Sequence, residues 1–243
     1  MKKKIIIVVP AYNAEKTLES VIKRIPKNFM KKIYEIILVD DGSKDKTYQV
    51  AKKLGLKIIK HLKNKGYGSA QKTGFSAALK DGADFVILLH SDGQYAPEYL
   101  PKIIKPLLNS ECDAVFGSRM LGGSVLNGGM PVHRYIGNKF LTSIENIIFG
   151  MNISEFHSGY RAYSKKALEN INFDLDSNSF VFDSEILVQI KDKGMKIGEV
   201  PIPTFYGHEI SYLKPMKYGF EILKVMSRYI LHKVRIIEYK QFK

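Results

Sequence analysis

Two oxygen-bearing side chains, Asp92 and Gln94, lie two residues apart in this 243-residue chain. They follow the apolar run FVILL at 85–89, which predicts a strand buried on both faces, and Pro97 then opens a predicted helix. Carboxylate and amide oxygens at this spacing could hold one hard cation, Mg²⁺ or Mn²⁺, and such a cation would bind a diphosphate. A strand-end turn in which both side chains only satisfy backbone groups is an equally open interpretation.

Two more predicted strands, at 5–9 and 33–39, also end in polar residues. Because the carboxyl ends of parallel strands share one edge of a sheet, we expect these residues to converge with Asp92. A carboxylate there could accept a hydrogen bond from a nucleobase N–H or a ribose hydroxyl. Asp40 and Asp41 could equally form only a turn and a helix cap, and Asn13 is a plausible helix N-cap. The residues at the three ends are Ala11, Tyr12, Asn13, Glu15, Asp40, Asp41, His90, Ser91, Asp92 and Gln94.

Phosphate-binding glycine motifs are missing from the start of the chain. Neither a G-x-G-x-x-G turn nor a P-loop follows the first predicted strand. Phosphates would therefore be held by a metal and by cationic side chains such as Arg119. Gly66 and Gly68 are explained by a tight turn, with main-chain contact to a nucleotide as an additional use.

Three further cationic side chains have both a functional and a structural interpretation. Arg161 could be a structural ion pair. His133 and Arg134 lie in a glycine-rich segment at 118–137, which is long for a connection, and they could be solvated loop residues. His90 suits a hydrogen-bonded strand end as well as it suits ligand binding. The functional prediction therefore depends on the joint arrangement and not on any single residue.

The formal net charge of +14 predicts acidic partners: nucleic acid, anionic lipid or phosphorylated substrates. Cys112 is the single cysteine and cannot form an internal disulfide, which fits a reducing compartment. The apolar run before Pro10 is too short for a signal peptide, and no stretch of about twenty apolar residues predicts a membrane span. The length favours one large α/β domain.

The order of predicted elements explains how the candidate residues would be brought together. Strands and helices alternate through the first half of the chain, which favours a mainly parallel sheet with right-handed crossovers. The segment around Arg161 predicts a strand that returns to the sheet, and 180–194 predicts a helix with Asp183 and Glu185 near its start. The other predicted elements are strands at 57–60, 114–117 and 195–205, and helices at 47–55, 69–80, 97–108, 138–149 and 215 to about 239.

Six motifs follow one another along the chain: VVPAYNAEKTL, VDDGSKDKT, NKGYGSAQKTGF, LLHSDGQYAPE, FGSRM and HSGYRAYSKKAL. Their order and spacing resemble the inverting family 2 glycosyltransferases, and within that family the branch containing dolichyl-phosphate mannose and glucose synthases. The resemblance covers residues 5 to about 203. It implies the GT-A fold, an α/β architecture with a mainly parallel central sheet flanked by helices, and a nucleotide-diphosphate-sugar donor.

The resemblance also implies roles for individual residues. Asp92 and Gln94 would hold the metal, Arg119 the phosphates, and Asp41, with Asp40 beside it, the base. Basic residues of the family's mobile loop and of its serine-glycine-aromatic-arginine motif face the acceptor phosphate, and here these are Arg134 and Arg161. The nucleotide pocket is expected to comprise Pro10, Ala11, Tyr12, Asn13, Glu15, Asp40, Asp41, Gly68 and Ser91, and the catalytic residues Asp92, Arg119 and Arg161, with Asp183 or Glu185 where a base is needed.

The chain departs from the family pattern in three respects. His90 stands where the family's metal motif often begins with a further Asp, so the metal would have fewer carboxylate ligands. The synthases' later arginine-glycine-serine-lysine segment is not recognisable, and this chain has YGHEISYLKP at 206–215. The chain has no Trp, which excludes the glutamine-arginine-tryptophan motif of processive polysaccharide synthases.

The sequence thus predicts a metal-dependent glycosyltransferase that moves one sugar, with inversion, from a UDP- or GDP-sugar to a polyprenyl (dolichyl) phosphate. A phosphate acceptor is already anionic, so it needs charge neutralisation and alignment more than a general base. The alternative acceptor is a hydroxyl of a sugar or lipid-linked glycan, with Asp183 or Glu185 as base. A basic nucleic-acid-binding protein is disfavoured because no aromatic-basic face or known module is recognisable, and a nucleotidyltransferase because its glycine-rich signature is missing.

Residues 214–243 predict an amphipathic basic helix that follows a catalytic domain at 1–213. Eight basic and two acidic residues give this tail a net charge of +6, with apolar residues interleaved. It could lie in the interface of an anionic leaflet, or pack on the protein's own core or in a dimer interface. We expect a peripheral protein at the cytoplasmic face of a membrane, and the sequence leaves a homo-oligomer open.

Overall fold

The computed structural model describes residues 3–123, 125–126, 128–204 and 215–243. The strands in this part of the chain are β1 (Ile5–Ala11), β2 (Ile33–Asp40), β3 (Lys57–Lys60), β4 (Phe85–Leu88), β5 (Ala114–Ser118), β6 (Arg161–Ser164) and β7 (Ile197–Pro201). They form one sheet in the order β3-β2-β1-β4-β6-β5-β7. Neighbouring strands are parallel except at β6, which is antiparallel to β4 and β5.

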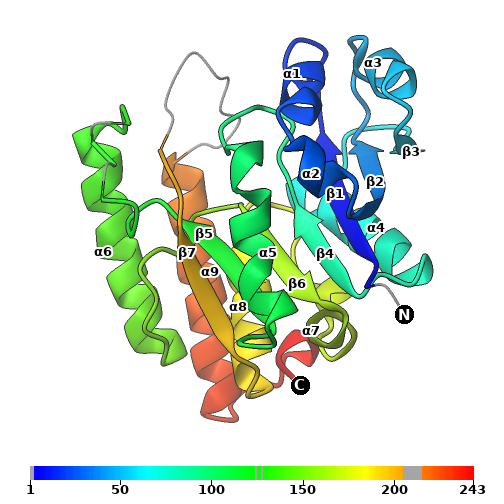
Figure 1. The fold of residues 1–243 in the computed structure, drawn as a ribbon. Helices are drawn as coiled ribbons and strands as arrows, with labels where there is room; N and C mark the ends of the chain where they lie inside the picture. Colours follow the sequence, from blue (N-terminus) through cyan, green and yellow to red (C-terminus); the bar gives the residue numbers. More distant parts are fainter. Residues whose placement is uncertain (1–2, 124, 127, 205–214) are drawn as a thin grey trace.

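Helices cover both faces of the sheet (Figure 1). The α-helices are α1 (Leu18–Lys23), α2 (Lys27–Met30), α3 (Thr47–Lys53), α4 (Tyr67–Lys80), α5 (Leu100–Leu108), α6 (Val132–Phe149), α7 (Lys165–Glu169), α8 (Phe182–Asp192) and α9 (Pro215–Lys233). Short 3₁₀ turns are η1 (Pro97–Tyr99), η2 (Phe173–Leu175) and η3 (Lys240–Phe242). This mainly parallel, helix-flanked α/β sheet is the architecture that the sequence predicts.

The central strand β1 shows why its sequence is a continuous apolar run. Successive side chains of a strand point to opposite faces, so Ile5, Ile7 and Val9 join the core under α1 and α5, whereas Ile6 and Val8 join the core under α4 and α8. All five residues are buried because helices cover both faces. The two cores fix the position of the carboxyl end of β1, where the candidate residues begin.

A third core lies beyond β5, between α6, α8 and α9. The side of α9 formed by Tyr218, Ile222, Val225 and Tyr229 is buried there, together with Phe149 at the end of α6. The tail helix therefore packs on the protein's own core along one side. It ends at Lys233, earlier than predicted, and the predicted domain boundary at 213 lies outside the described residues.

Two local predictions are wrong. Asn13 is not a helix N-cap: its φ is 52°, and α1 begins only at Leu18, after Thr17. Helix α6 begins at Val132, six residues before the predicted start at 138, because Pro131 suits the position before a first helical turn. His133 and Arg134 therefore lie in the first turn of a helix and not in a loop.

None of the helices in the described ranges is long and apolar enough to cross a membrane. The longest, α9, carries charged residues along its length.

Gly74 allows α4 to pack closely on β1. A Cβ added at Gly74 would lie 2.2 Å from Cγ1 of Val8, which is buried in the sheet. We expect Gly74→Ala to lower the free energy of unfolding by about 1–3 kcal/mol, because overpacking outweighs the roughly 1 kcal/mol that alanine gains over glycine in a helix.

Urea unfolding would measure this effect, with Gly219→Ala as the matched control. Gly219 is also helical, in α9, but a Cβ there meets nothing within 4 Å. Its replacement should raise stability slightly, by up to about 1 kcal/mol. Equal effects of the two substitutions would contradict the close-packing explanation.

Candidate active site

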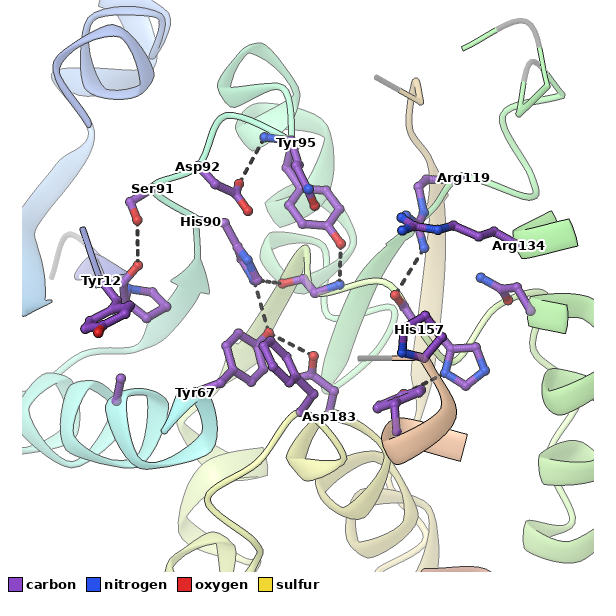
Figure 2. Close-up of a pocket in the computed structure, with 18 of the residues that line it drawn as sticks. Tyr12, Tyr67, His90, Ser91, Asp92, Tyr95, Arg119, Arg134, His157 and Asp183 are labelled. Atoms are coloured by element: carbon purple, nitrogen blue, oxygen red, sulfur yellow. Dashed lines mark hydrogen bonds between the residues drawn. The ribbon is translucent and has the colours of Figure 1, made fainter. Parts of the chain in front are cut away.

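A cavity of about 700 Å³ lies at the carboxyl ends of β1 and β4. Residues from all three predicted strand ends reach its lining: Tyr12, Asp41 and Asp92 each come from one of them. The opposite side comes from Arg119 after β5 and from the first turns of α6 and α9 (Figure 2). The lining includes Pro10, Ala11, Tyr12, Asp41, Tyr67, His90, Ser91, Asp92, Gln94, Arg119, Arg134, His157, Asp183 and Tyr218.

Asp92 and Gln94 both face this cavity. Oδ1 of Asp92 accepts a hydrogen bond from the main-chain amide of Gln94 at 3.0 Å. The other carboxylate oxygen of Asp92 makes no hydrogen bond with a described residue. A carboxylate and an amide oxygen suit Mg²⁺ or Mn²⁺, which often bind through one or two protein ligands and substrate phosphates. Within the described ranges no three His, Cys, Asp or Glu side chains group as a metal site, so the diphosphate itself would complete the coordination.

His90 occupies the position where the family often has another Asp. Its Nε2 atom lies 3.1 Å from the carbonyl oxygen of Gly159 and 3.1 Å from the hydroxyl of Tyr67. Because a carbonyl can only accept, Nε2 carries the proton and donates it. The ring also packs edge-on against Tyr95. His90 is therefore a hydrogen-bonded strand-end group, one of the two interpretations left open by the sequence.

One end of the cavity, which we call the donor end, contains Asp41 and Ser91. The carboxylate of Asp41 is bound by the buried His61, at 2.6 Å, and by two main-chain amides. Ser91 donates to the carbonyl of Pro10 at 3.0 Å and so joins the ends of β4 and β1. Tyr12 lies beside Ser91 in Figure 2.

Four of the residues expected in the nucleotide pocket lie outside the cavity lining. Asp40 is fully buried, and its Oδ1 accepts from the Ser43 amide. The side chains of Asn13 and Glu15 accept from main-chain amides of the loop after β2, so they join two loops. Gly68 lets α4 approach the chain at Ser177, whose carbonyl oxygen would lie 2.4 Å from an added Cβ. In this geometry all four support the pocket from behind.

Two arginines extend over the other end of the cavity. Arg134, from the first turn of α6, points toward Arg119 in Figure 2. Arg119 is held by Glu155 through its Nε, at 2.9 Å, and through its main-chain amide. Although burial alone would raise it, the Arg119 guanidinium holds the pKa of the Glu155 carboxyl below its usual value. This end of the cavity is therefore built for anionic groups.

Arg161 is completely buried and does not belong to the lining. Its guanidinium donates to the main-chain carbonyls of Ser158, Asp183 and Phe156, at 2.9, 2.7 and 2.8 Å. Direct contact with an acceptor phosphate has no support in this arrangement, because the donors are used within the protein. Arg161 is a structural residue beneath the site.

The two candidate bases are placed very differently. Asp183 faces the cavity, but its carboxylate accepts from the Tyr67 hydroxyl at 2.8 Å and from the Gln71 amide at 3.2 Å. Burial and the Asp183 charge raise the pKa of Tyr67 well above its usual value, so the hydroxyl stays protonated and donates. Glu185 lies outside the lining and accepts from Ser177, which corrects its expected place in the site.

A second buried acid, Glu145, lies on α6 beneath the acceptor end. Its Oε2 is 3.2 Å from Nε2 of His157, whose Nδ1 is 2.7 Å from the Tyr218 hydroxyl on α9. Burial raises the pKa of Glu145 to about 8 and lowers that of His157 to about 4. Both groups are therefore neutral at pH 7.

Several residues of the site were not predicted from the sequence, among them Tyr67, Glu155, His157 and Tyr218. Tyr67 and His157 lie inside recognised motifs, NKGYG and HSGYR, so their position was available as a signal. Glu155 precedes the second motif by two residues, and nothing in the sequence marks Tyr218.

The model for the family described as "Glycosyl transferase family 2" matches residues 6–171. A UDP-N-acetylglucosamine–dolichyl-phosphate N-acetylglucosaminyltransferase from Methanococcus voltae is 36% identical over 222 residues, which cover 84% of this chain and 86% of the relative. A dolichol-phosphate mannosyltransferase from Pyrococcus furiosus is 33% identical over 205 residues, 82% of this chain and 55% of the relative. Glucosyl-3-phosphoglycerate synthase from Mycobacterium tuberculosis, solved with Mg²⁺ and UDP, superposes with a TM-score of 0.70 at 21% identity, covering 94% of this chain and 78% of that one.

A helix-flanked sheet with a cavity at the carboxyl ends of its strands is typical of nucleotide-binding α/β proteins. The structural neighbour shows that the fold is of the GT-A type. The chain belongs to glycosyl transferase family 2.

The Glu145 proton makes stability depend on pH. From about pH 6.5 to 8 the folded protein holds it, whereas the unfolded chain, with an ordinary carboxyl, does not. The folded state then binds more protons, so the contribution of Glu145 to the free energy of unfolding falls as pH rises, by up to about 2 kcal/mol. His157 titrates at or below the lower end of this window in both states.

Glu145→Gln should remove this dependence, since an amide keeps the contacts to Ser184 and His157 but does not titrate. Urea unfolding at pH 6.5 and 8 should show wild type losing more stability than the variant. Glu98→Gln, at an exposed ion pair, is the control and should follow wild type. Parallel losses in wild type and Glu145→Gln would contradict the assignment.

Proposed function

We propose that this protein transfers one sugar, with inversion, from a UDP- or GDP-sugar to a polyprenyl phosphate. In the reaction an acceptor phosphate oxygen bonds to the anomeric carbon as the bond from that carbon to the nucleoside diphosphate breaks. The names of the relatives from Methanococcus voltae and Pyrococcus furiosus support this acceptor class.

The observation that carries the proposal is that the carboxylates lining the cavity are already bound within the protein or assigned to the metal. The carboxylates in the described lining are Asp41, Asp92 and Asp183. Asp41 and Asp183 are each bound by several donors, and we assign Asp92 to the metal. A hydroxyl acceptor needs a base to remove its proton, but the Asp183 carboxylate is already bound by Tyr67 and Gln71, and Glu185 lies outside the lining. A phosphate acceptor is ionised already and needs none.

The remaining residues have matching roles in this proposal. Asp92 and Gln94 hold Mg²⁺ or Mn²⁺ against the donor diphosphate. When bound, the ion would stabilise the negative charge that develops on the leaving group. Arg119 and Arg134 align the phosphate groups of donor and acceptor.

The decisive experiment is a panel of UDP- and GDP-sugars with and without polyprenyl phosphate. We expect release of nucleoside diphosphate and formation of lipid-linked sugar only when both substrates and a divalent ion are present. Asp92→Ala should lower the rate about 100-fold or more, since charge stabilisation on the leaving group contributes several kcal/mol, and Gln94→Ala should lower it less.

Glu98→Ala is the matched control, because Glu98 is a nearby acid that is paired with Arg24 and lies outside the lining. Its activity should stay near wild type. Full activity in EDTA, or transfer to a sugar hydroxyl with polyprenyl phosphate inert, would overturn the corresponding part of the proposal.

We further propose that the protein binds the surface of an anionic leaflet, at the cytoplasmic face of a membrane. Helices α6 and α9 pack against each other, and their first turns line the cavity. Each helix also carries one exposed apolar stripe at helical spacing, flanked by Lys and Arg. The stripes are Val132, Ile136, Phe140 and Ile147 on α6 and Met216, Phe220, Leu223 and Ile230 on α9.

These stripes fit interfacial binding that keeps a lipid-borne acceptor near the cavity. Each basic residue near an anionic surface adds about 1 kcal/mol, screened by salt. Binding should therefore need anionic lipid and fall steeply as ionic strength rises.

Vesicle flotation tests this surface with Phe140→Glu and Phe220→Glu, two positions that are 65% and 67% exposed. We expect each to reduce recovery with anionic vesicles about 10-fold or more. In each variant an aromatic side chain that would insert into the leaflet is replaced by a charge that the leaflet repels. Leu62→Glu, at an exposed residue after the far edge strand β3, is the control and should float like wild type. Equal recovery of wild type with neutral and anionic vesicles would contradict membrane binding.

A further inference from the structure

Asp41 is held by three donors at the donor end of the cavity. Its Oδ1 accepts from Nδ1 of His61 at 2.6 Å and from the Lys65 amide at 2.9 Å. Its Oδ2 accepts from the Gly66 amide at 2.9 Å. His61 is itself buried and is fixed from behind by the Thr73 hydroxyl, 2.9 Å from its Nε2.

These contacts leave Asp41 with little remaining acceptor capacity. Each carboxylate oxygen offers about two acceptor positions. Both positions of Oδ1 are used, and one position of Oδ2 is left. The two successive amides of Lys65 and Gly66 bind the two oxygens together, so a second side-by-side pair of donors finds no matching pair of acceptors. Asp41 is only 4% exposed, and the cavity is where that surface lies.

The nucleobases differ in the donors that they present to such a group. Uracil offers a single N3–H between two carbonyl oxygens, which needs one acceptor. Guanine offers N1–H and the adjacent amino group, which a carboxylate binds best with two free oxygens. Cytosine has an unprotonated N3 that would oppose the carboxylate.

We infer that Asp41, saturated by His61, Lys65 and Gly66, selects uracil, so that the donor is a UDP-sugar and His61 is a positioning residue that determines base specificity. This inference rests on the proposed function, which places the nucleobase at Asp41. It deepens that function by naming the donor class. It also gives a defined role to His61, which lies outside the cavity lining, because His61 occupies the acceptor position on Oδ1 that guanine would need.

Calorimetry of the full chain with Mg²⁺ and UDP, GDP or CDP tests the inference without any acceptor. We expect UDP to bind about 10-fold or more tightly than either GDP or CDP, the range for one charge-assisted hydrogen bond gained or lost. GDP or CDP binding as tightly as UDP would overturn it.

Two variants at His61 separate positioning from a merely structural role. His61→Leu removes the donor and opens Oδ1, so the ratio of GDP to UDP affinity should rise about 10-fold. His61→Asn keeps an N–H near the position of Nδ1 and should retain the wild-type ranking. His232→Leu, at a histidine on α9 outside the lining, is the control and should also retain it. If His61→Leu does not fold, the wild-type and His61→Asn rankings decide.

The outcomes distinguish this inference from the proposed function. Preference for GDP, together with transfer from a GDP-sugar to polyprenyl phosphate, overturns the uracil selection and leaves the function standing. Preference for UDP without any transfer to polyprenyl phosphate does the reverse. No binding of any of the three nucleotides overturns both.

Discussion

The buried guanidinium of Arg161 is the interaction on which the Arg119 side of the site depends. A fully desolvated charge is costly unless its donors are satisfied, and here three main-chain carbonyls, at 2.7–2.9 Å, satisfy them. Two of those carbonyls, from Phe156 and Ser158, belong to the segment that precedes β6, and the third belongs to the start of α8. The arginine thereby fixes an irregular segment, which lies outside the strands of the sheet, against a helix.

That segment in turn positions the groups that face the cavity. Glu155 holds Arg119, the carbonyl of Gly159 holds His90, and His157 joins Glu145 to Tyr218. Residues from β4, β5, α6 and α9 are thus brought to one place by contacts to a few consecutive residues. The antiparallel strand β6 makes this possible, because its reversed direction delivers the segment before it to the edge where the parallel strands end.

The sequence predicted the sheet and its ligand-binding edge well, because apolar runs such as 5–9 and 85–89 and the polar residues after them follow rules of local periodicity. It also predicted that Asp41, Asp92 and Gln94 reach one cavity, since parallel strands end at a common edge. The sequence did not predict roles that depend on how the surrounding structure packs around a side chain. Arg161 and Glu185 have suitable chemistry, but packing directs one to carbonyls and the other to Ser177. Spacing along the chain carries no information on such long-range partners, so the sequence did not indicate the contacts of Glu145 and His61 either.

The same reasoning explains why a histidine can stand at position 90. In the proposed reaction a donor diphosphate and an acceptor phosphate would approach each other in one cavity, where each additional carboxylate would repel both. His90 replaces an acid with an N–H donor that is bound to Gly159 and Tyr67, so the segment after β4 keeps its shape. The other acids of the lining, Asp41 and Asp183, are each hydrogen-bonded by donors within the protein. The cavity therefore keeps Asp92 for a cation, while Arg119 and Arg134 on the opposite side set a positive potential for the phosphates. A site arranged in this way favours two anionic substrates over an anionic and a neutral one.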